Sequence, residues 1–223
     1  MWYKLKRIMM RPNGVEKQVR PSGWQFGNAI LYCPYTSGVD DYSDNHRVVT
    51  VDTVSQYATF SSQGMNIQPW GNHNWTKLVY GTDPVNSTSF TIGGFIKMTE
   101  RHDNSHFFTV NWWWLCFIPA WWAFRFETYG LGIHNCRTTS TISYDTRYCV
   151  FWVRDNDSTK IYLNWVQEWT SSQSGVKTWQ PLITAWWGDT TVDRCPRWYL
   201  KHLIYEDRAW STQEISDYYN EFI

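Results

Sequence analysis

Acidic and amide side chains gather in one short loop near the start of the chain, at Asp40, Asp41, Asp44 and Asn45. Their oxygens are the ligands that hard cations such as Ca²⁺ prefer. The same residue types also build turns, because Asp and Asn side chains accept hydrogen bonds from their own backbone. Two interpretations therefore remain open for this loop: a calcium site, or a turn closed by its own side chains. A second, sparser acidic pair follows at Asp189 and Asp193.

Residue patterns typical of enzymes are missing from the sequence. The six histidines form no His-Glu-x-x-His motif, and the polar run around His102 and His106 predicts a loop, not a helix that would align them on one metal. The five cysteines include no Cys-x-x-Cys pair and are odd in number, which argues against a zinc site or a full disulfide framework. No nucleophile elbow, phosphate-binding loop or dinucleotide fingerprint occurs. We therefore expect a protein that is not an enzyme.

Tryptophan is unusually frequent, since the chain has 17 Trp and only 13 Gly. Runs of tryptophan occur at residues 112–114, 121–122 and 186–187. One interpretation is a sugar-binding surface, because indole rings suit surfaces that are apolar on one side and wet on the other. Against it, a patch of many exposed Trp side chains would exceed the apolar area that soluble monomers usually expose.

Some of these tryptophans occupy positions where a β-protein normally has glycine. Trp165 follows Asn164 in the place that completes an Asn-Gly hairpin turn, where both central residues need positive φ. Our hypothesis is that 13 of the 17 tryptophans, all but Trp2, Trp24, Trp152 and Trp210, are functionally glycine. Such a pattern arises when a UGA codon that some bacteria and phages read as glycine is translated as tryptophan. The hypothesis predicts that Trp165 and Trp198 lie in turns or at exposed strand ends, some with positive φ.

Over most of the chain, the residue pattern predicts short strands separated by clusters of turn-forming residues. The predicted strands are residues 29–35, 48–54, 57–61, 89–98, 107–110, 115–118, 123–127, 148–154, 160–164, 182–185 and 198–206, with 155–159 as a hairpin loop. One helix is predicted after Ser211, because Ser211 and Glu214 form a capping box and Ile215 and Tyr219 share a face. Many strands followed by one short helix predict an all-β fold, a two-sheet antiparallel β-sandwich or jelly roll.

The first residues predict a separate unit. Alternating segments flank the turn Pro12-Asn13-Gly14, which is typical of a β-hairpin. We therefore divide the chain into an N-terminal hairpin or attachment segment, residues 1–23, and one domain, residues 24–223. The hairpin either docks on its own domain or attaches the domain to a partner.

Charge and hydropathy exclude some partners. The chain carries 20 Lys+Arg and 20 Asp+Glu, so no basic surface for nucleic acid is expected. No apolar stretch approaches the length of a membrane span, so no membrane insertion is expected. The first residues contain basic side chains but lack the apolar run and cleavage site of a secretion signal.

Four segments, taken in order, resemble the concanavalin A-like lectin/glucanase superfamily in its laminin G-like, pentraxin-like jelly-roll form. They are Leu31–Tyr35 with the loop 41–45, Phe90–Lys97, Thr146–Val153 with Lys160–Asn164, and Arg197–Leu200 with Ile204–Ile215. Together they span roughly residues 28–220. The sequence departs from the family pattern where Asp44, Trp165 and Trp198 replace glycines.

The resemblance implies a jelly roll that recognises carbohydrate or another cell-surface polymer and acts outside the cell, on a cell surface or on a virion. Many relatives bind calcium near the rim of the sandwich. The family's glucanases carry a Glu-x-Asp-x-x-Glu strand with two carboxyls ~5 Å apart, and neither Glu206-Asp207 nor the pair Glu214 and Asp217 fits that spacing. We therefore expect a non-catalytic recognition module. The alternative is a structural or adhesion domain of a surface fibre or phage virion, attached through residues 1–23.

Overall fold

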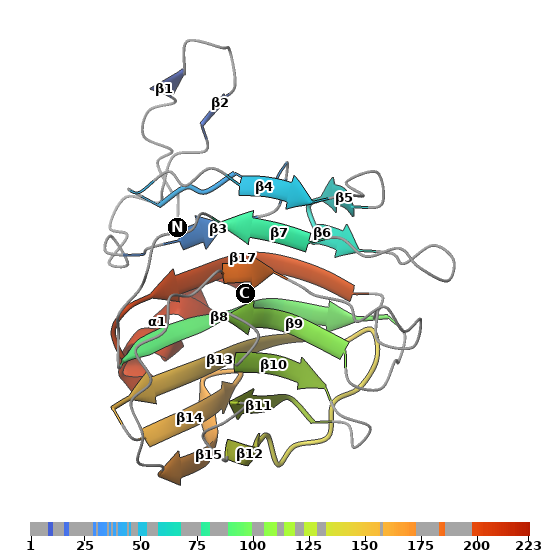
Figure 1. Ribbon diagram of the computed structural model, residues 1–223. Coiled ribbons are helices and arrows are strands. Elements are labelled where there is room, and N and C mark those ends of the chain that lie inside the picture. Colours follow the sequence, from blue (N-terminus) through green and yellow to red (C-terminus); the bar gives the residue numbers. More distant parts are fainter. Residues whose placement is uncertain are drawn as a thin grey trace.

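The strand Phe90–Met98, labelled β8 in Figure 1, lies near the middle of the larger of two sheets. Its sequence alternates apolar side chains with Thr91, Gly93, Phe95 and Lys97, and residues on both faces of its first half are buried. A half-exposed strand buries one face only. β8 is therefore covered on both sides, by the second sheet on its inner face and by the helix α1 (Thr212–Phe222) on its outer face.

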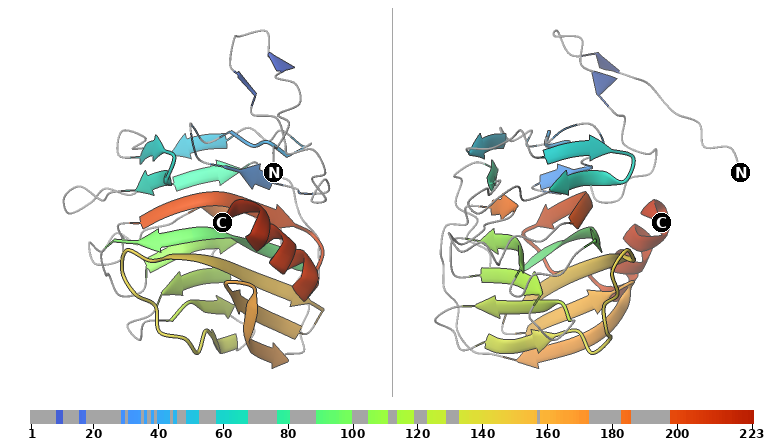
Figure 2. Two further views of the ribbon diagram at one scale, coloured as in Figure 1. Left: turned by 180° about the vertical axis from the view of Figure 1, so that it is seen from behind. Right: turned by 90° about the vertical axis from the view of Figure 1, so that its right-hand side faces the viewer.

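The computed structural model describes residues 9–10, 16–17, 29, 31–34, 36, 38, 40–43, 45, 49–52, 58–67, 77–80, 89–99, 105–110, 114–118, 123–128, 133–156, 158–172, 183–185 and 198–223. All strand pairs among them are antiparallel. They form two facing layers, with α1 on the outer side of one of them (Figure 2). This arrangement confirms the predicted two-sheet β-sandwich with a C-terminal helix.

The larger sheet has eight strands. Their order is β15 (Val166–Ser172), β14 (Ser158–Leu163), β13 (Arg147–Asp155), β8, β17 (Trp198–Glu206), β6 (Gly64–Ile67) and β5 (Ala58–Ser61), and β3 (Leu31–Cys33) also pairs with β17. The smaller sheet has seven strands. Their order is β12 (Ile133–Arg137), β11 (Arg125–Thr128), β10 (Trp114–Ile118), β9 (Ser105–Val110), β16 (Ile183–Ala185), β7 (Lys77–Tyr80) and β4 (Val49–Asp52).

The predicted N-terminal hairpin is present. β1 (Met9–Met10) pairs with β2 (Glu16–Lys17), and the pair stands apart from both larger sheets in Figures 1 and 2. The predicted turn at Pro12-Asn13-Gly14 lies outside the described residues.

Two apolar layers hold the large sheet in place. Between the sheets, Trp152 is fully buried and meets Phe124 edge-to-face at a ring distance of 6.4 Å. On the outer side, Phe151 meets the α1 residue Tyr218 edge-to-face at 5.0 Å. Gly93 makes room for Phe151, because a Cβ at Gly93 would lie 2.3 Å from the Phe151 ring. Trp152 and Trp210 are core residues, as predicted.

The capping box predicted for the helix is confirmed. The Ser211 hydroxyl accepts a hydrogen bond from the backbone N–H of Glu214, and Glu214 accepts one from the backbone N–H of Ser211 at 2.8 Å. Ile215 is buried and Tyr219 partly buried on the face that meets the sheet. The sequence thus located both the start of the helix and its packing face.

The tryptophan expectations gave a mixed result. Asn164 and Trp165 have φ of 48° and 67°, and they connect β14 to β15, so Trp165 lies in a left-handed turn as predicted. Trp198 contradicts the expectation, because it is fully buried at the start of β17 opposite Met98 and Ile67. It faces the space between the sheets, where a large apolar side chain is stabilised by burial.

Other sequence predictions need correction. The hairpin loop is shorter than residues 155–159, because β13 continues to Asp155 and β14 already begins at Ser158, with Asn156 at a φ of 51°. Four strands were not predicted at all: β6, β7, β12 and β15. β6, β12 and β15 are polar or contain glycine or tryptophan, and β7 has only four residues, so no period-two pattern marks them.

Candidate functional site

Asp41, from the acidic loop, is a buried structural residue. Its Oδ1 accepts hydrogen bonds from the backbone N–H of Tyr32 at 3.0 Å and of Ser43 at 2.8 Å, and its Oδ2 accepts one from the Ser43 hydroxyl at 2.8 Å. The backbone N–H of Tyr42 also donates to the Tyr32 carbonyl at 2.7 Å. The Asp41 carboxylate therefore holds the loop against β3 by hydrogen bonds, as expected of a turn that is closed by an Asp side chain.

The other predicted calcium ligands do not gather around Asp41 in the described residues. Asp40 is exposed, and the Asn45 amide donates to the Ala29 carbonyl at 3.4 Å. Asp44, Asp189 and Asp193 lie outside the described residues. Within the described ranges, no group of three or more His, Cys, Asp or Glu side chains is placed to hold a metal ion. Calcium binding by this loop stays a prediction.

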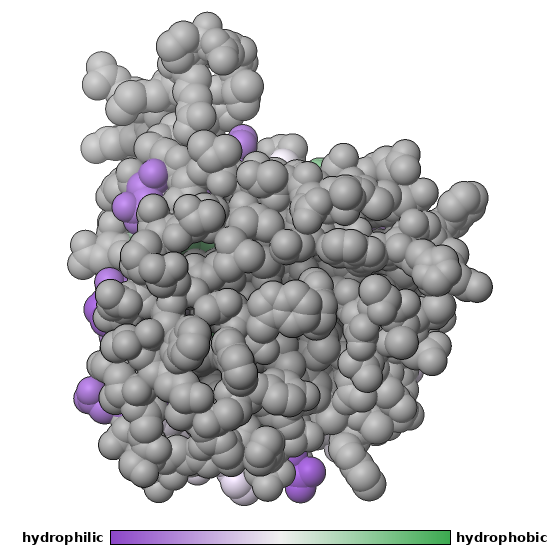
Figure 3. All heavy atoms as spheres, viewed as in Figure 1, coloured by the Kyte–Doolittle hydropathy of each residue, from purple (hydrophilic) through white to green (hydrophobic). Residues whose placement is uncertain are grey.

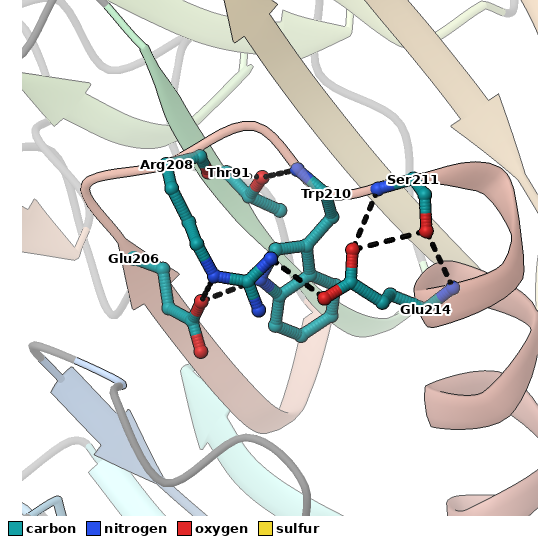
Figure 4. A network of polar contacts seen from close by, with 6 residues as sticks. All are labelled: Thr91, Glu206, Arg208, Trp210, Ser211 and Glu214. Carbon is teal, nitrogen blue, oxygen red and sulfur yellow. Dashed lines mark hydrogen bonds and ion pairs between the residues drawn. The ribbon is translucent and has the colours of Figure 1, made fainter.

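A polar network, of which Thr91, Glu206 and Trp210 are buried, surrounds the start of α1 (Figure 4). The Glu206 carboxylate accepts hydrogen bonds from the Trp210 indole at 2.7 Å and from the Arg208 guanidinium at 2.8 Å. Arg208 also pairs with Glu214 at 2.6 Å. The Thr91 hydroxyl links the backbone at Arg208 to that at Trp210, with both bonds at 2.8 Å. The network joins β8, the end of β17 and the helix.

The electrostatics of this network point to a structural role. Burial raises the pKa of Glu206, although the hydrogen bond from Trp210 and the charge of Arg208 oppose this rise. The pKa of Glu214 is lowered, because the bonds from Ser211 and Arg208 outweigh its partial burial. Two carboxyls with divergent pKa values can form an acid–base pair. However, Glu206 is fully buried, so its carboxyl cannot reach a substrate.

A second set of polar side chains lies on the outer face of the large sheet. Asn66, Tyr199, Lys97 and Arg147 are direct neighbours on β6, β17, β8 and β13. We call these four residues the outer-face row. Tyr199, Lys97 and Arg147 are each partly exposed. The helix lies across part of this face (Figure 2, left), where Phe95, two residues before Lys97 on β8, stacks on Tyr218 and Tyr219.

Contacts within the outer-face row hold its side chains in place. The Asn66 amide donates to the Tyr199 hydroxyl at 3.3 Å, and the Lys97 ammonium lies 5.7 Å from the centre of the Tyr199 ring. Lys97 also pairs with Asp145 at 3.3 Å. An aromatic ring flanked by amide, hydroxyl and ammonium groups can stack on the apolar face of a sugar and hydrogen-bond its hydroxyls.

One edge of the outer-face row is closed by the β5–β6 turn. The same Arg147 nitrogen donates to the Gln63 carbonyl at 2.8 Å and to its side-chain oxygen at 2.7 Å. Gly64 permits this turn with a φ of 110°, where a Cβ would lie 2.4 Å from the Leu200 carbonyl oxygen. Lys201, two residues beyond Tyr199 on β17, lies against Gly64, because a Cβ at Gly64 would lie 2.9 Å from the Lys201 Cβ. Two cationic residues, Arg147 and Lys201, therefore contact the β5–β6 turn, at Gln63 and Gly64 respectively.

Among the described residues at this turn, the pKa values of Arg147, Lys201 and His202 are all lowered. Burial lowers the pKa of Arg147, and burial together with the Arg147 charge lowers that of Lys201. Burial, with the charges of Lys201 and Arg147, lowers the pKa of His202 to about 3, so its ring is neutral at physiological pH. The His202 ring is hydrogen-bonded to the Tyr32 hydroxyl at 2.8 Å and stacks on Phe222 at 4.2 Å.

Most of the tryptophan runs lie outside the described residues, so a tryptophan platform is not tested there. Trp165 and Trp169 are 45% and 37% exposed, and the Trp165 ring lies 5.0 Å from that of Tyr219 on α1. Figure 3 shows that the described residues visible on its face are mostly hydrophilic and lie along the edges. In the described part of the chain, no helix has the length and hydropathy of a membrane span.

Sequence reasoning did not identify the outer-face row. The alternation in β8 does place Lys97 on the same face as Thr91 and Phe95. The four residues come together only through the pairing of β6, β17, β8 and β13, which joins parts of the chain as distant as Asn66 and Tyr199. The pattern within one strand shows which side chains share a face, but not which residue of a strand distant in sequence lies opposite them.

No protein-family model matches the sequence, and no curated protein does either. Solved structures do share the fold. The binding domain of Paraclostridial Mosquitocidal Protein 1 has a TM-score of 0.64 at 13% identity, over 87% of this chain and 52% of that one. A botulinum neurotoxin type C whose cell entry depends on interaction with two ganglioside molecules has a TM-score of 0.64 at 12% identity, over 88% and 51%.

A mutant of Trypanosoma rangeli sialidase that displays trans-sialidase activity has a TM-score of 0.65 at 11% identity, over 87% of this chain and 33% of that chain. The protein thus spans about half the length of the two toxin chains and a third of the sialidase. At such low identity the likeness concerns the fold.

Proposed function

We propose that this chain is a non-catalytic recognition module that binds a carbohydrate or another cell-surface polymer on the outer face of its eight-stranded sheet. The observation that carries the proposal is the outer-face row, a partly exposed Tyr199 ring held between the Asn66 amide and the Lys97 ammonium. The likeness to toxin binding domains, one of them from a toxin that depends on gangliosides, supports a role at a cell surface.

A glycan array with purified protein tests this proposal. Tyr199→Ala removes the ring and hydroxyl, and we expect binding of the array hit to weaken about tenfold, since aromatic anchors each contribute ~1–3 kcal/mol at binding sites. Trp169→Ala is the matched control, because it removes another partly exposed ring of the same sheet. Equal weakening by both variants, or no array binding at all, would show that the row is not the site.

The hairpin β1–β2 favours a second candidate function. It stands apart from both sheets, as an attachment element would, so the alternative is a structural or adhesion domain of a surface fibre or phage virion, attached through residues 1–23. Under either function the protein acts outside the cell, on a cell surface or on a virion. A defined oligomer in solution that is lost when residues 1–23 are deleted would favour the structural role.

The fold family and calcium belong to the same proposal. The segments that resemble the concanavalin A-like, laminin G-like family fall on β3, β8, the β13–β14 hairpin and β17 with α1, which supports that assignment. For Ca²⁺, the oxygens of Asp40, Asp44 and Asn45 are of the right type, and Asp41 would fix the loop that presents them. If the loop holds Ca²⁺, removal of the calcium by EDTA is expected to weaken ligand binding.

We retain the glycine hypothesis for Trp165 and withdraw it for the buried Trp198. The support is the φ of 67° at Trp165 in an Asn-x turn, a conformation that glycine adopts without strain. Mass spectrometry of the protein made by its own host tests it directly. Glycine at position 165 is the expected result, and tryptophan there, or a UGG codon in the gene, would end the hypothesis.

A further inference from the structure

The most unusual charged pair in the described residues is Arg147 and Lys201. Both are partly buried, and both lie at the β5–β6 turn: Arg147 is hydrogen-bonded to Gln63, and the next residue, Gly64, lies against the Lys201 side chain. Burial, and to a lesser degree the Arg147 charge, lowers the pKa of Lys201. A lysine or arginine that is fully buried is almost always paired, and these two side chains have lost part of their water. Among the described side chains, neither has one: the ion pairs there are Lys97 with Asp145 and Arg208 with Glu206 and Glu214.

The geometry leaves donors free on this pair. Arg147 uses a single nitrogen for both of its bonds to Gln63, so the other N–H groups of its guanidinium have no partner in the described part of the chain. The Lys201 ammonium has neither a hydrogen bond nor an ion pair there. An arginine fork beside a lysine matches the oxygens of a carboxylate or sulfate group, which accept charge-assisted hydrogen bonds.

The pair also costs the fold stability. Bringing two like charges together while removing part of their water is unfavourable for each, and the partly buried, neutral His202 beside them supplies no compensation. Destabilising charge arrangements that persist in a fold are typical of functional sites. The overall charge of the chain is balanced, so any attraction for anions is local to this position.

From these observations we infer that Arg147 and Lys201 bind the acidic group of a glycan, a carboxylate or sulfate, while the neighbouring outer-face row binds its sugar rings. This inference rests on the proposed function, because it names the class of glycan that the same face takes. It places the acidic group under the β5–β6 turn, next to Tyr199, and predicts selection of acidic over neutral glycans.

The inference is tested by measuring the affinity of the protein for a series of acidic and a series of neutral oligosaccharides. Hits from the glycan array are measured again by calorimetry. Lys201→Met keeps the aliphatic stem and removes the charge, and it should weaken acidic glycans about tenfold, the value of one charge-assisted bond. Lys160→Met on β14 is the matched control, since it removes a partly exposed lysine of the same sheet away from the row. It should leave affinity unchanged, and raising salt should weaken wild-type binding.

The stability of the variants separates ligand binding from a structural role. If Lys201 serves the ligand, Lys201→Met unfolds at a urea concentration equal to or above that of the wild type. Inorganic sulfate, titrated at constant ionic strength, should shift the amide resonances around Lys201 saturably in the wild type and not in Lys201→Met. A lower unfolding midpoint for Lys201→Met would overturn the inference.

Failure of the inference and failure of the proposed function give different results. Neutral glycans that bind at Tyr199 with an affinity unaffected by Lys201→Met would overturn the inference and leave the proposed function standing. Binding of no glycan of either series would overturn both, even if the protein bound anionic lipid vesicles.

Discussion

Replacing Trp165 by glycine should give a more stable protein than replacing it by alanine. Both changes remove the indole and its 5.0 Å contact with Tyr219, so this loss cancels when the two variants are compared. At a φ of 67°, a residue with a Cβ costs ~1–2 kcal/mol in left-handed geometry. Glycine loses ~0.5–1 kcal/mol more backbone entropy on folding. The glycine variant should therefore be more stable by about 0.5–1 kcal/mol, the difference of these values.

Urea denaturation of the two variants under identical conditions measures this difference, and a shift of about 2 °C in thermal midpoint should accompany it for a domain of this size. Val166, the next residue, provides the control. It lies within β15 and is not among the residues with positive φ, so alanine there should be more stable than glycine. An alanine variant at position 165 that equals or exceeds the glycine variant would refute the reasoning about the turn.

Three further predictions concern the packing, the pH dependence and the loop. Gly93→Ala should destabilise the protein by ~1–3 kcal/mol, measured by urea unfolding, because its Cβ would overlap the Phe151 ring; an unchanged midpoint would contradict this packing. Partial burial raises the pKa of Glu168, but hydrogen bonds from Ser140 and Thr139 lower it overall. The stability that these bonds contribute is present at neutral pH and lost as the pH falls below the ordinary value of 4.5. Glu168→Gln should therefore be less stable than the wild type at pH 7 and nearly equal to it at acid pH. A difference in unfolding free energy that does not change with pH would argue against a stabilising role of the ionised Glu168 carboxylate. Calcium should raise the thermal midpoint of the wild type and not that of Asp44→Asn, whereas no shift in the wild type would favour a turn without calcium.

Local patterns were sufficient to predict much of the fold. The capping box at Ser211 and Glu214 located the helix, and the apolar alternation in β8 and β17 located the central strands, because these signals lie within a few neighbouring residues. The buried Trp198 could not be assigned in this way. Its environment depends on Ile67 and Met98, which are distant in sequence and adjacent only in the sheet.

The candidate site was harder to predict than the fold. The acidic loop was a candidate calcium site because its residues are close in sequence. In the structure, however, Asp41 is buried and accepts a hydrogen bond from the backbone of β3. The outer-face row contains one residue from each of four strands. Sequence reasoning could have found Lys97 as a polar position in the apolar strand β8, but not that Tyr199 lies beside it, since no turn joins β8 directly to β17 and a strand's own pattern does not name its distant partner.

Mapping of a bound oligosaccharide by amide chemical shifts tests the central claim most directly. The claim is that this protein recognises its ligand on the outer face of the eight-stranded sheet, between α1 and the β5–β6 turn. It predicts that shifts concentrate on β6, β8, β13 and β17, around Tyr199. Shifts confined to the seven-stranded sheet, or to the loop 40–45, would contradict it.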